Sequence, residues 1–482
     1  MSTAFSPSSL NPSVLNVQYA VRGPLAIRAE EYRSRIKKDP HGHGLPFDQV
    51  VTANIGNPQQ AGLDQKPLTF GRQIAALLEY PPLMDSGKSL FPPDVIQRAR
   101  ELYAEIGSIG AYSQSQGVPF IRQNVAKFIH TRDGYPSNPS DIFLTAGASA
   151  GVSLIINMLI ASPSTGILIP IPQYPLYTAA LAQHKGVPIP YYLDESNGWS
   201  TDPQDIEMAI AKASGQGTQV KALVIINPGN PTGAVLRSST MQDVLRVCER
   251  HNLVLLADEV YQSNIHDPAQ PFVSFKKVLR ASNSPVPLVS FHSISKGVTG
   301  ECGRRGGYFE LVNVPEETKA LVYKMLSVGL CPPLGGQVGV DCLVRPPIPG
   351  EYSYPLWKEE TDAIHSALAS RTHIIATRLD ALPGVSCVAA PGAMYLFPQL
   401  QLPDAAIEAA KVAGHEPDEF YTLELLDQTG ICAVPGSGFG QKEGEAHFRL
   451  TCLSAGVEEY IGKLETFQRS FWKKYGGELA KA

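Results

Sequence analysis

The eighteen residues FHSISKGVTGECGRRGGY, from Phe291 to Tyr308, place one lysine shortly after an apolar run. The run ends at Phe291 and predicts a strand, and Lys296 follows it in a turn rich in serine and glycine. Small neighbours allow a flat cofactor or an anion to approach, and desolvation would lower the pKa of the amine and make it a Schiff-base nucleophile. A surface lysine is the ordinary alternative for an isolated S-x-S-K, so the interpretation depends on partners elsewhere in the chain.

Short apolar runs alternate with helix-like segments on the N-terminal side of this stretch. They predict strands at 142–144, 166–169, 222–226, 253–256 and 288–291. Helices are predicted between them, near 150–161, 204–214 and 239–251. Because the strands are apolar on both faces, helices must cover both sides of the sheet. The pattern predicts an α/β fold with a mainly parallel central sheet.

The domain organisation follows from breaks in this pattern. Residues 1–70 contain many breaks, and we interpret them as an arm and a loop that belong to a smaller domain and to a dimer contact. Residues 71–348 are predicted to form the large domain that carries Lys296, beginning with helices at 71–84 and 93–106. A Pro-rich segment then precedes a small C-terminal domain over 349–482.

The C-terminal domain is predicted to have an α+β arrangement. It begins with a long amphipathic helix at 357–382, with Leu368, Ile375 and Leu379 on its apolar side. Strands are predicted at 385–400 and at 448–453, and helices near 405–413, 418–428 and 457–474. Mixed strands and helices of this kind form a separate layer beside an α/β domain.

Composition restricts the classes of partner. Of the 482 residues 43% are hydrophobic, and 40 Lys and Arg oppose 45 Asp and Glu, without a long basic run for nucleic acid. The seven cysteines lie far apart and are expected to be reduced, as in the cytoplasm. No run approaches the roughly 20 apolar residues of a membrane span, and the opening segment lacks a secretory pattern, although a mitochondrial location stays open. The eleven histidines show no ligand spacing, so no metal site is expected.

Polar residues follow three consecutive predicted strands. Asn230 lies in the turn NPGNPTG, Asp258 ends the apolar run LVLLAD, and Lys296 follows the third strand. Tyr261 lies three residues after Asp258. Because ligands bind at the carboxyl ends of strands in open α/β sheets, we expect these side chains to meet at one edge.

A fourth predicted strand leads into TAGASAG, where Ala148 and Ser149 open a helix whose free amides can hold a phosphate, and Arg305 could supply a cation. Each of these residues has an ordinary alternative as a cap, a turn residue or a surface charge. Their joint occurrence favours a cofactor site. A lysine, an acid, polar groups for a phenolic oxygen and a phosphate cup are the parts that pyridoxal 5'-phosphate needs.

The motifs SISK, NPGNPTG, ADEVY and GRRGG resemble those of the fold-type I, class I aminotransferases. Over residues 11–452 the chain is similar to the alanine aminotransferase family, in the motifs QYAVRG, NIGNP, GAYSQSQG, PIPQYPLY, YYLDES, GECGRRGGY, PGSGFGQ and HFRLT. The resemblance implies a fold-type I pyridoxal-phosphate-dependent transferase that acts as a homodimer. It also implies transfer of the amino group of L-alanine to 2-oxoglutarate, giving pyruvate and L-glutamate by a ping-pong mechanism.

The alternatives within this fold are a glutamate–glyoxylate or other small-substrate aminotransferase and a lyase. A non-enzymatic regulator is a further alternative, but it would need a DNA-binding domain, and residues 1–70 show no helix-turn-helix pattern. We therefore expect amino acids and 2-oxo acids as partners, and neither nucleic acid nor a membrane.

The resemblance also implies roles for the residues around the ring of the cofactor. Lys296 would bind the cofactor covalently and then move a proton, and Asp258 would bond the ring nitrogen. Tyr261 and Asn230 would bond the phenolic oxygen, and Tyr174 would stack on the ring.

The remaining implied roles concern the phosphate and the substrate. The phosphate would be held by Ser293, Ser295, Ala148, Ser149 and Arg305, with Tyr112 reaching in from a second subunit. Arg449 would bind the substrate α-carboxylate, helped by the backbone of Gly56 and by Asn230. Arg304 lies eight residues after the lysine, the spacing common in class I enzymes, and is the alternative phosphate ligand. Val298 stands where the family commonly has an aromatic residue.

Overall fold

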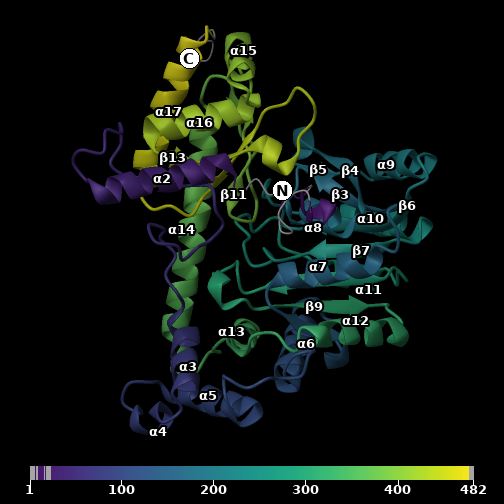
Figure 1. Ribbon diagram of the computed structural model, residues 1–482. Helices are drawn as coiled ribbons and strands as arrows, with labels where there is room; N and C mark the ends of the chain where they lie inside the picture. Colours follow the sequence, from purple (N-terminus) through teal and green to yellow (C-terminus); the bar gives the residue numbers. More distant parts are fainter. Residues whose placement is uncertain (1–5, 7–8, 16, 18–22, 477–482) are drawn as a thin grey trace.

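The computed structural model describes residues 6, 9–15, 17 and 23–476. Most of the QYAVRG motif lies outside the described residues. Figure 1 shows two groups of elements, one around a central sheet and one where the C-terminal helices gather around the long helix α14 (Tyr354–Asp380), and each group encloses a hydrophobic core.

An eight-stranded sheet forms the centre of the first core. Its order is β2-β9-β8-β7-β6-β3-β4-β5. The strands are β2 (Ile142–Thr145), β3 (Thr165–Ile171), β4 (Val187–Asp194), β5 (Ser200–Thr201), β6 (Gln219–Ile226), β7 (Val254–Asp258), β8 (Leu288–Ser293) and β9 (Gly307–Val312). β4, β3, β6, β7 and β8 are mutually parallel, whereas β9 runs antiparallel to β8 and β2. The predicted α/β fold with a mainly parallel sheet is therefore confirmed.

Helices cover both faces of this sheet, as the two-sided apolar strands require. One face packs on α7 (Ala148–Leu159), α8 (Leu176–His184) and α12 (Glu316–Val328). The other face packs on α9 (Pro203–Gly215), α10 (Ser238–Arg250) and α11 (Phe275–Ala281). Towards β2 that face is continued by α3 (Thr69–Glu79), α5 (Pro93–Ile106), α6 (Pro119–Asp133) and α13 (Leu334–Val344).

The second core contains Tyr421, Phe448, Phe467 and Phe471, all buried. It is built from α14, α15 (Asp404–Ala413), α16 (Pro417–Thr429) and α17 (Val457–Lys474) with short strands. Those strands are β10 (Val385–Ser386), β11 (Tyr395–Leu396), β12 (Gln399–Leu400), β13 (Ile431–Cys432), β14 (Val434–Pro435) and β15 (Phe448–Thr451). β1 (Val51–Thr52) pairs with β13, so a segment near the N-terminus joins this core.

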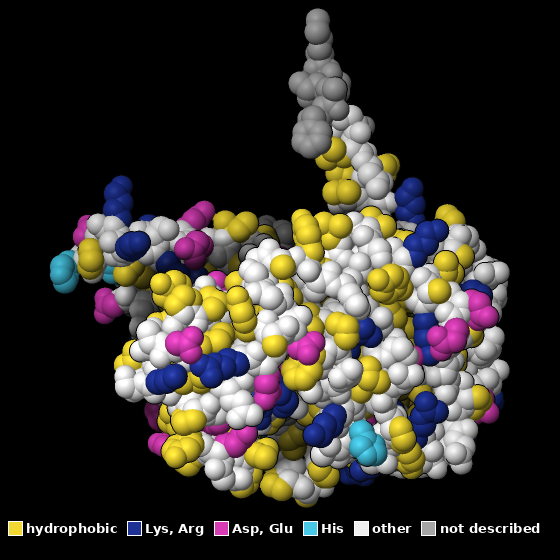
Figure 2. Space-filling model, turned by 90° about the horizontal axis from the view of Figure 1, so that it is seen from below, with side chains coloured by type: hydrophobic (Ala, Val, Ile, Leu, Met, Phe, Trp, Pro, Cys, Tyr) yellow, Lys and Arg dark blue, Asp and Glu magenta, His cyan; other side chains and the backbone are white. Residues whose placement is uncertain are grey.

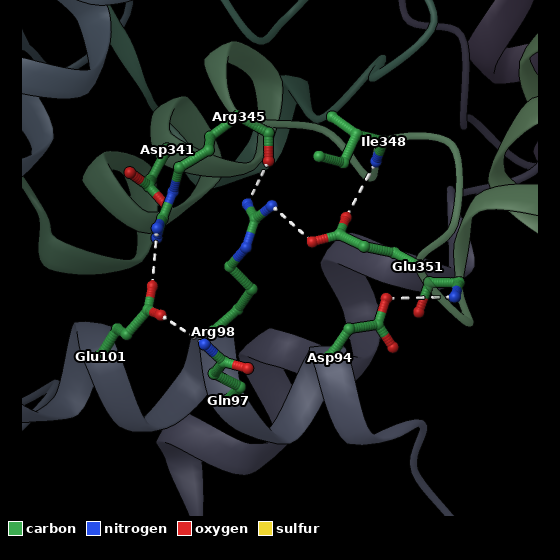
Figure 3. A network of polar contacts seen from close by, with 9 residues as sticks. Asp94, Gln97, Arg98, Glu101, Asp341, Arg345, Ile348 and Glu351 are labelled. Carbon is green, nitrogen blue, oxygen red and sulfur yellow. Dashed lines mark hydrogen bonds and ion pairs between the residues drawn. The ribbon is translucent and has the colours of Figure 1, made fainter.

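A polar network fixes the segment that leads into α14 (Figure 3). Arg98 on α5 donates to the carbonyl oxygen of Arg345 at 2.6 Å and to Glu351 at 3.3 Å. Arg345 in turn pairs with Glu101 at 2.7 Å and with Asp341 at 2.9 Å. These contacts anchor the start of α14 to α5 and α13, which belong to the first core. The division of the chain at 348/349 stays a prediction.

Several predicted elements differ in the structure. Residues 1–70, interpreted as an arm and a loop, contain the helix α2 (Pro24–Lys38), which is mostly polar and buries only Leu25 and Ala29 among its residues. The helix predicted at 71–84 is α3 and then the short α4 (Leu83–Ser86), because Pro81 and Pro82 interrupt it.

Strand prediction also has local errors. The region 385–400 holds three two-residue strands in place of a longer one. The predicted long strand is interrupted by Pro391, Gly392 and Pro398. β4 and β9 were not predicted. Prolines interrupt β4, and β9 begins within the last two residues of the motif that was interpreted as a site.

The surface carries charges of both signs. On the face shown in Figure 2, Lys and Arg side chains lie interspersed with Asp and Glu. No helix among the described residues has the length and apolar character needed to cross a membrane.

Candidate active site

A cavity of about 800 Å³ opens at the carboxyl ends of β6, β7 and β8. These three strands are neighbours in the sheet, and the register aligns Ile226 with Asp258 and Asp258 with Phe291. The cavity is lined by the predicted residues Gly56, Ala148, Ser149, Tyr174, Asn230, Asp258, Tyr261, Ser293, Ser295, Lys296, Arg305 and Arg449. The structure thus brings together twelve of the thirteen residues assigned to the site from the sequence, and Arg304, the alternative phosphate ligand, lies on the same lining. Their roles stay predictions.

Tyr112 is the predicted residue that lies outside the cavity lining. Its side chain is 79% exposed. The next residue, Ser113, donates its backbone N–H to Cys331 Sγ at 3.4 Å, which fixes the loop to the segment before α13. A residue predicted to act in a second subunit is expected to be exposed in one chain.

Asp258 ends β7 and is 5% exposed. Its Oδ2 accepts a hydrogen bond from the Tyr177 hydroxyl at 2.8 Å, and its Oδ1 accepts a long one from Val260 N–H at 3.4 Å. Burial raises the pKa of this carboxyl to about 6, against the lowering effects of Tyr177, Val260 and the charge of Lys296. A cationic partner in the cavity would stabilise the ionised form and lower this pKa.

Lys296 lies in the turn after β8, and its Nζ donates to the carbonyl oxygen of Gly56 at 2.5 Å. The same amine lies 5.8 Å from the centroid of the Tyr261 ring. A Cβ at Gly56 would lie 2.0 Å from the Tyr395 hydroxyl oxygen and 2.9 Å from Lys296 Nζ. Only glycine therefore allows this backbone to approach the lysine.

A chain of hydrogen bonds connects the ring-oxygen partners to the buried arginine. Asn230 Nδ2 donates to the Tyr261 hydroxyl at 3.3 Å, and that hydroxyl lies 2.9 Å from the Tyr395 hydroxyl. Arg449 donates to Asn230 Oδ1 at 3.0 Å. Burial, and then the neighbouring Tyr395, raise the pKa of Tyr261 well above its ordinary value, so its phenol stays protonated and can donate to an anionic oxygen.

Arg449 lies on β15 and is 2% exposed. Its guanidinium donates to the carbonyl oxygen of Asn54 at 2.6 Å. It lies over the rings of Tyr395 and Phe439, with centroid distances of 4.4 and 4.6 Å. The two hydrogen bonds to Asn230 and Asn54 and the two ring contacts hold the planar guanidinium in place, and a guanidinium is suited to bind a carboxylate.

Arg305, rather than Arg304, lies at the start of α7. Its NH2 group donates to the carbonyl oxygen of Ala146 at 3.0 Å and to Ser149 Oγ at 3.3 Å. Gly147, at φ +82°, makes space for this guanidinium, because a Cβ at this position would lie 2.3 Å from the NH2 nitrogen of Arg305. Arg304 instead donates to Glu301 at 3.1 Å.

The donor set of the cavity fits pyridoxal 5'-phosphate. One end offers the Arg305 guanidinium, the first turn of α7 and the Ser293 and Ser295 hydroxyls, which are donors for a phosphate. The middle offers the Asp258 carboxylate for a ring nitrogen and the protonated Tyr261 for a ring oxygen. The Lys296 amine, near the Tyr261 ring, and the Arg449 guanidinium, over the Tyr395 ring, lie on the same lining.

Tyr177 and Tyr395 are among the residues at the site that were not found from the sequence. Tyr177 lies in the quoted motif PIPQYPLY, but nothing local shows that its hydroxyl reaches Asp258. Tyr395 lies on β11 of the second core, and only the tertiary fold brings it to Tyr261. His292, interpreted as a packed strand residue, is buried in β8.

The known proteins that are similar to this chain are named as aminotransferases. The family model described as aminotransferase class I and II matches residues 76–464. A probable mitochondrial alanine aminotransferase of Dictyostelium discoideum is 48% identical over 474 residues, covering 96% of this chain and 88% of that protein. Glutamate–glyoxylate aminotransferase 2 of Arabidopsis thaliana is 46% identical over 481 residues, covering 98% and 97%. The solved structure of an alanine aminotransferase from Pyrococcus furiosus has a TM-score of 0.75 at 23% identity, covering 96% and 100%, and it is evidence for the fold.

Proposed function

The chain belongs to the class I and II aminotransferases, and we propose that it transfers the amino group of L-alanine to 2-oxoglutarate, giving pyruvate and L-glutamate. The observation that carries the proposal is one cavity with a lysine amine, a buried carboxylate at a strand end and a buried guanidinium. The 48% identical relative named as a probable alanine aminotransferase supports the choice of substrates.

The family depends on pyridoxal 5'-phosphate, which supplies an aldehyde that combines with amino groups and a ring that takes up the electrons of a breaking bond. Lys296 Nζ would hold this group covalently and, once released, take the proton from the substrate α-carbon. The carbonyl oxygen of Gly56, which accepts from Nζ at 2.5 Å, fixes the position of the amine on the lining of the cavity. This position lets one group act as both anchor and base.

The other residues bind and orient. Asp258 would hold the ring nitrogen in its protonated form, and Tyr261 with Asn230 would bond the ring oxygen. Tyr174 would cover the ring face. Ser293, Ser295, Ala148, Ser149 and Arg305 would hold the phosphate.

Arg449 would bind the substrate α-carboxylate in two parallel hydrogen bonds, with the backbone of Gly56 beside it. Asn230 contacts both Arg449 and Tyr261, so it fixes the α-carboxylate relative to the ring oxygen. Because the α-carboxylate is fixed relative to the ring, its position decides which bond of the α-carbon faces the lysine.

A panel of amino donors and 2-oxo acids tests the proposal. With 2-oxoglutarate as acceptor, we expect kcat/KM for alanine to exceed that for leucine, phenylalanine or aspartate by about tenfold or more, because a larger side chain is excluded when the site closes. Keto-acid release without amino transfer would contradict the proposal and favour a lyase.

Glyoxylate is the acceptor of the second candidate function. It is favoured by the 46% identical relative named glutamate–glyoxylate aminotransferase 2. Higher kcat/KM for glyoxylate with glutamate than for pyruvate with glutamate would establish it in place of the first.

Tyr177→Phe is predicted to shift the pH dependence of the enzyme. Asp258 must be ionised to hold a protonated ring nitrogen, so it functions above its pKa. Loss of a hydrogen bond to a charged group costs about 1.5–3 kcal/mol, so the pKa of Asp258 should rise by about one to two units at 1.36 kcal/mol per unit. The acid limb of kcat/KM should therefore move towards neutral pH.

Tyr191→Phe is the matched control for this experiment. Tyr191 is also buried, and its hydroxyl donates at 2.8 Å, but to the carbonyl oxygen of Val224. The control should lose stability without a shift of the acid limb. If the pH dependence of kcat/KM were the same for both variants, Tyr177 would have a packing role only.

A homodimer is the assembly that we propose. The exposed Tyr112 supports this assembly. Val328 (81% exposed) and Leu330 (54% exposed) also support it, and they lie just before Cys331, which accepts the hydrogen bond from Ser113 beside Tyr112. Apolar side chains exposed to this extent favour an interface. Sedimentation equilibrium should give twice the chain mass of 52.0 kDa. A fully active species of one chain mass would contradict this prediction.

The cytoplasm is the compartment that we propose. All seven cysteines are free, which agrees with a reducing environment. The mitochondrion is the alternative, because the Dictyostelium relative is named mitochondrial. Cell fractionation distinguishes the two compartments.

A further inference from the structure

We propose that Arg72, together with Arg304 and Glu301, forms a subsite for the second carboxylate of glutamate and 2-oxoglutarate. The inference rests on the proposed function, in which one site must accept a methyl group from alanine and an anionic side chain from glutamate. The α-carboxylate is common to both substrates and is assigned to Arg449. The second carboxylate needs a separate donor group in the same cavity, because a buried charge without a partner is costly.

Five cationic side chains line the cavity: Lys296, Arg305, Arg449, Arg72 and Arg304. Lys296 is proposed to hold the cofactor, Arg305 lies at the start of α7, and Arg449 is buried beside Asn230. Arg72 and Arg304 are the cations on the described lining that have no assigned role.

Both arginines contact the same carboxylate. Arg72, on α3, donates to the two oxygens of Glu301 at 2.8 and 3.1 Å. Arg304 donates to Glu301 Oε2 at 3.1 Å. Two guanidinium groups and one carboxylate leave a net charge of +1 at this wall of the cavity. A surplus positive charge of this kind attracts an additional carboxylate and has little effect on a methyl group.

The position of the cluster connects it to the reacting amine. Gln59 Oε1 accepts from Arg72 at 2.6 Å, and Gln59 follows Gly56, whose carbonyl oxygen contacts Lys296, by three residues. Glu301 lies in the loop that carries Lys296, and its backbone N–H donates to the carbonyl oxygen of Ile294 at 2.9 Å. The cluster is therefore fixed to both segments that hold the lysine.

Glu301 occupies the place that a substrate carboxylate would take. When alanine is bound, Arg72 keeps Glu301 as its partner, so no unpaired charge faces the methyl group. When glutamate or 2-oxoglutarate is bound, Arg72 turns to the substrate while Arg304 continues to hold Glu301. The exchange is assigned to Arg72 because its side chain is 45% exposed, against 28% for Arg304 and 16% for Glu301. Ion pairs with this exposure exchange partners at little cost.

Two substitutions should have opposite effects on dicarboxylate binding. Arg72→Gln removes the donor, so the dissociation constant of glutarate, an unreactive dicarboxylate, should rise by about tenfold or more on the holoenzyme. Glu301→Gln removes the internal competitor, so the same constant should fall. Titration calorimetry measures both, and propionate, which has one carboxylate, should bind equally to all variants.

Single-turnover half-reactions give the second readout. In Arg72→Gln the apparent affinity for glutamate should fall by about tenfold or more while that for alanine changes less than about twofold. Arg100→Gln is the matched control, because Arg100 forms a similarly exposed ion pair with Asp85 away from the cavity. Thermal unfolding checks that loss of the link between α3 and the loop of Glu301 leaves the fold intact.

The two readouts separate the subsite from the proposed function. Equal losses for alanine and glutamate in Arg72→Gln, or unchanged glutarate binding, would overturn the subsite. Absence of an alanine half-reaction in the wild type would overturn the proposed function, while the glutarate titrations would still decide whether Arg72 binds a second carboxylate.

Discussion

Lys296→Ala is expected to lose transamination and, with it, the visible absorption of lysine-bound cofactor. The amine is the one lysine on the described lining of the cavity, and its Nζ is held by the carbonyl oxygen of Gly56. We propose that this group is both covalent anchor and proton carrier, so removing it should lower kcat by about 10⁴-fold or more, because acid–base catalysis alone contributes about 10²–10⁴-fold. Steady-state kinetics and the absorption spectrum of the purified variant measure the two effects.

A control is available on the surface of the same domain. Lys212 is an exposed residue of α9, and Lys212→Ala should keep both activity and absorption. Retention of the visible band by Lys296→Ala would show that another group binds the cofactor. Retention of turnover without the band would show that proton transfer does not depend on this amine.

The strand-end residues could be predicted because their signal is local. Apolar runs locate β6, β7 and β8, and the parallel arrangement places their carboxyl ends at one edge. Asn230, Asp258 and Lys296 were therefore expected together, and the cavity contains all three. The prediction needed the order of residues along the chain and one general rule of sheet topology.

The choice between Arg304 and Arg305 needed the tertiary fold. The two arginines differ by only one residue in their spacing from Lys296, so the sequence left both possible as the phosphate ligand. In the structure Arg305 has φ +54° and turns to the start of α7, whereas Arg304 pairs with Glu301. A local backbone feature of this kind leaves no periodic pattern in the sequence.

Tyr395 and Arg72 show a different limit. Tyr395 belongs to the second core and Arg72 to a helix that begins at Thr69, and each meets residues more than a hundred positions away. Contacts of such sequence separation are set by how the elements pack, and neither residue lies in a motif with its partner. The helix α2 was missed for a third reason, since it is stabilised by few buried residues and has a weak apolar stripe.

Arg449→Lys is expected to lose most of the activity with every amino donor. The guanidinium donates to Asn230 Oδ1 and to the carbonyl oxygen of Asn54, and it contacts the rings of Tyr395 and Phe439. A planar fork can keep these contacts and still offer two parallel donors to a carboxylate, whereas an ammonium group is a point charge without a flat face for the rings. Losing one of two charged hydrogen bonds and the ring packing should cost about 3–4 kcal/mol.

That cost corresponds to about a 10²–10³-fold loss in kcat/KM at 1.36 kcal/mol per factor of ten. The loss should be equal for alanine and glutamate, because both carry the α-carboxylate, and this distinguishes Arg449→Lys from Arg72→Gln. Arg378→Lys is the matched control, since Arg378 binds Glu465 through two hydrogen bonds of 2.7 and 2.6 Å between α14 and α17, outside the cavity. A loss below about fivefold, or a loss confined to one donor, would mean that the α-carboxylate is bound elsewhere.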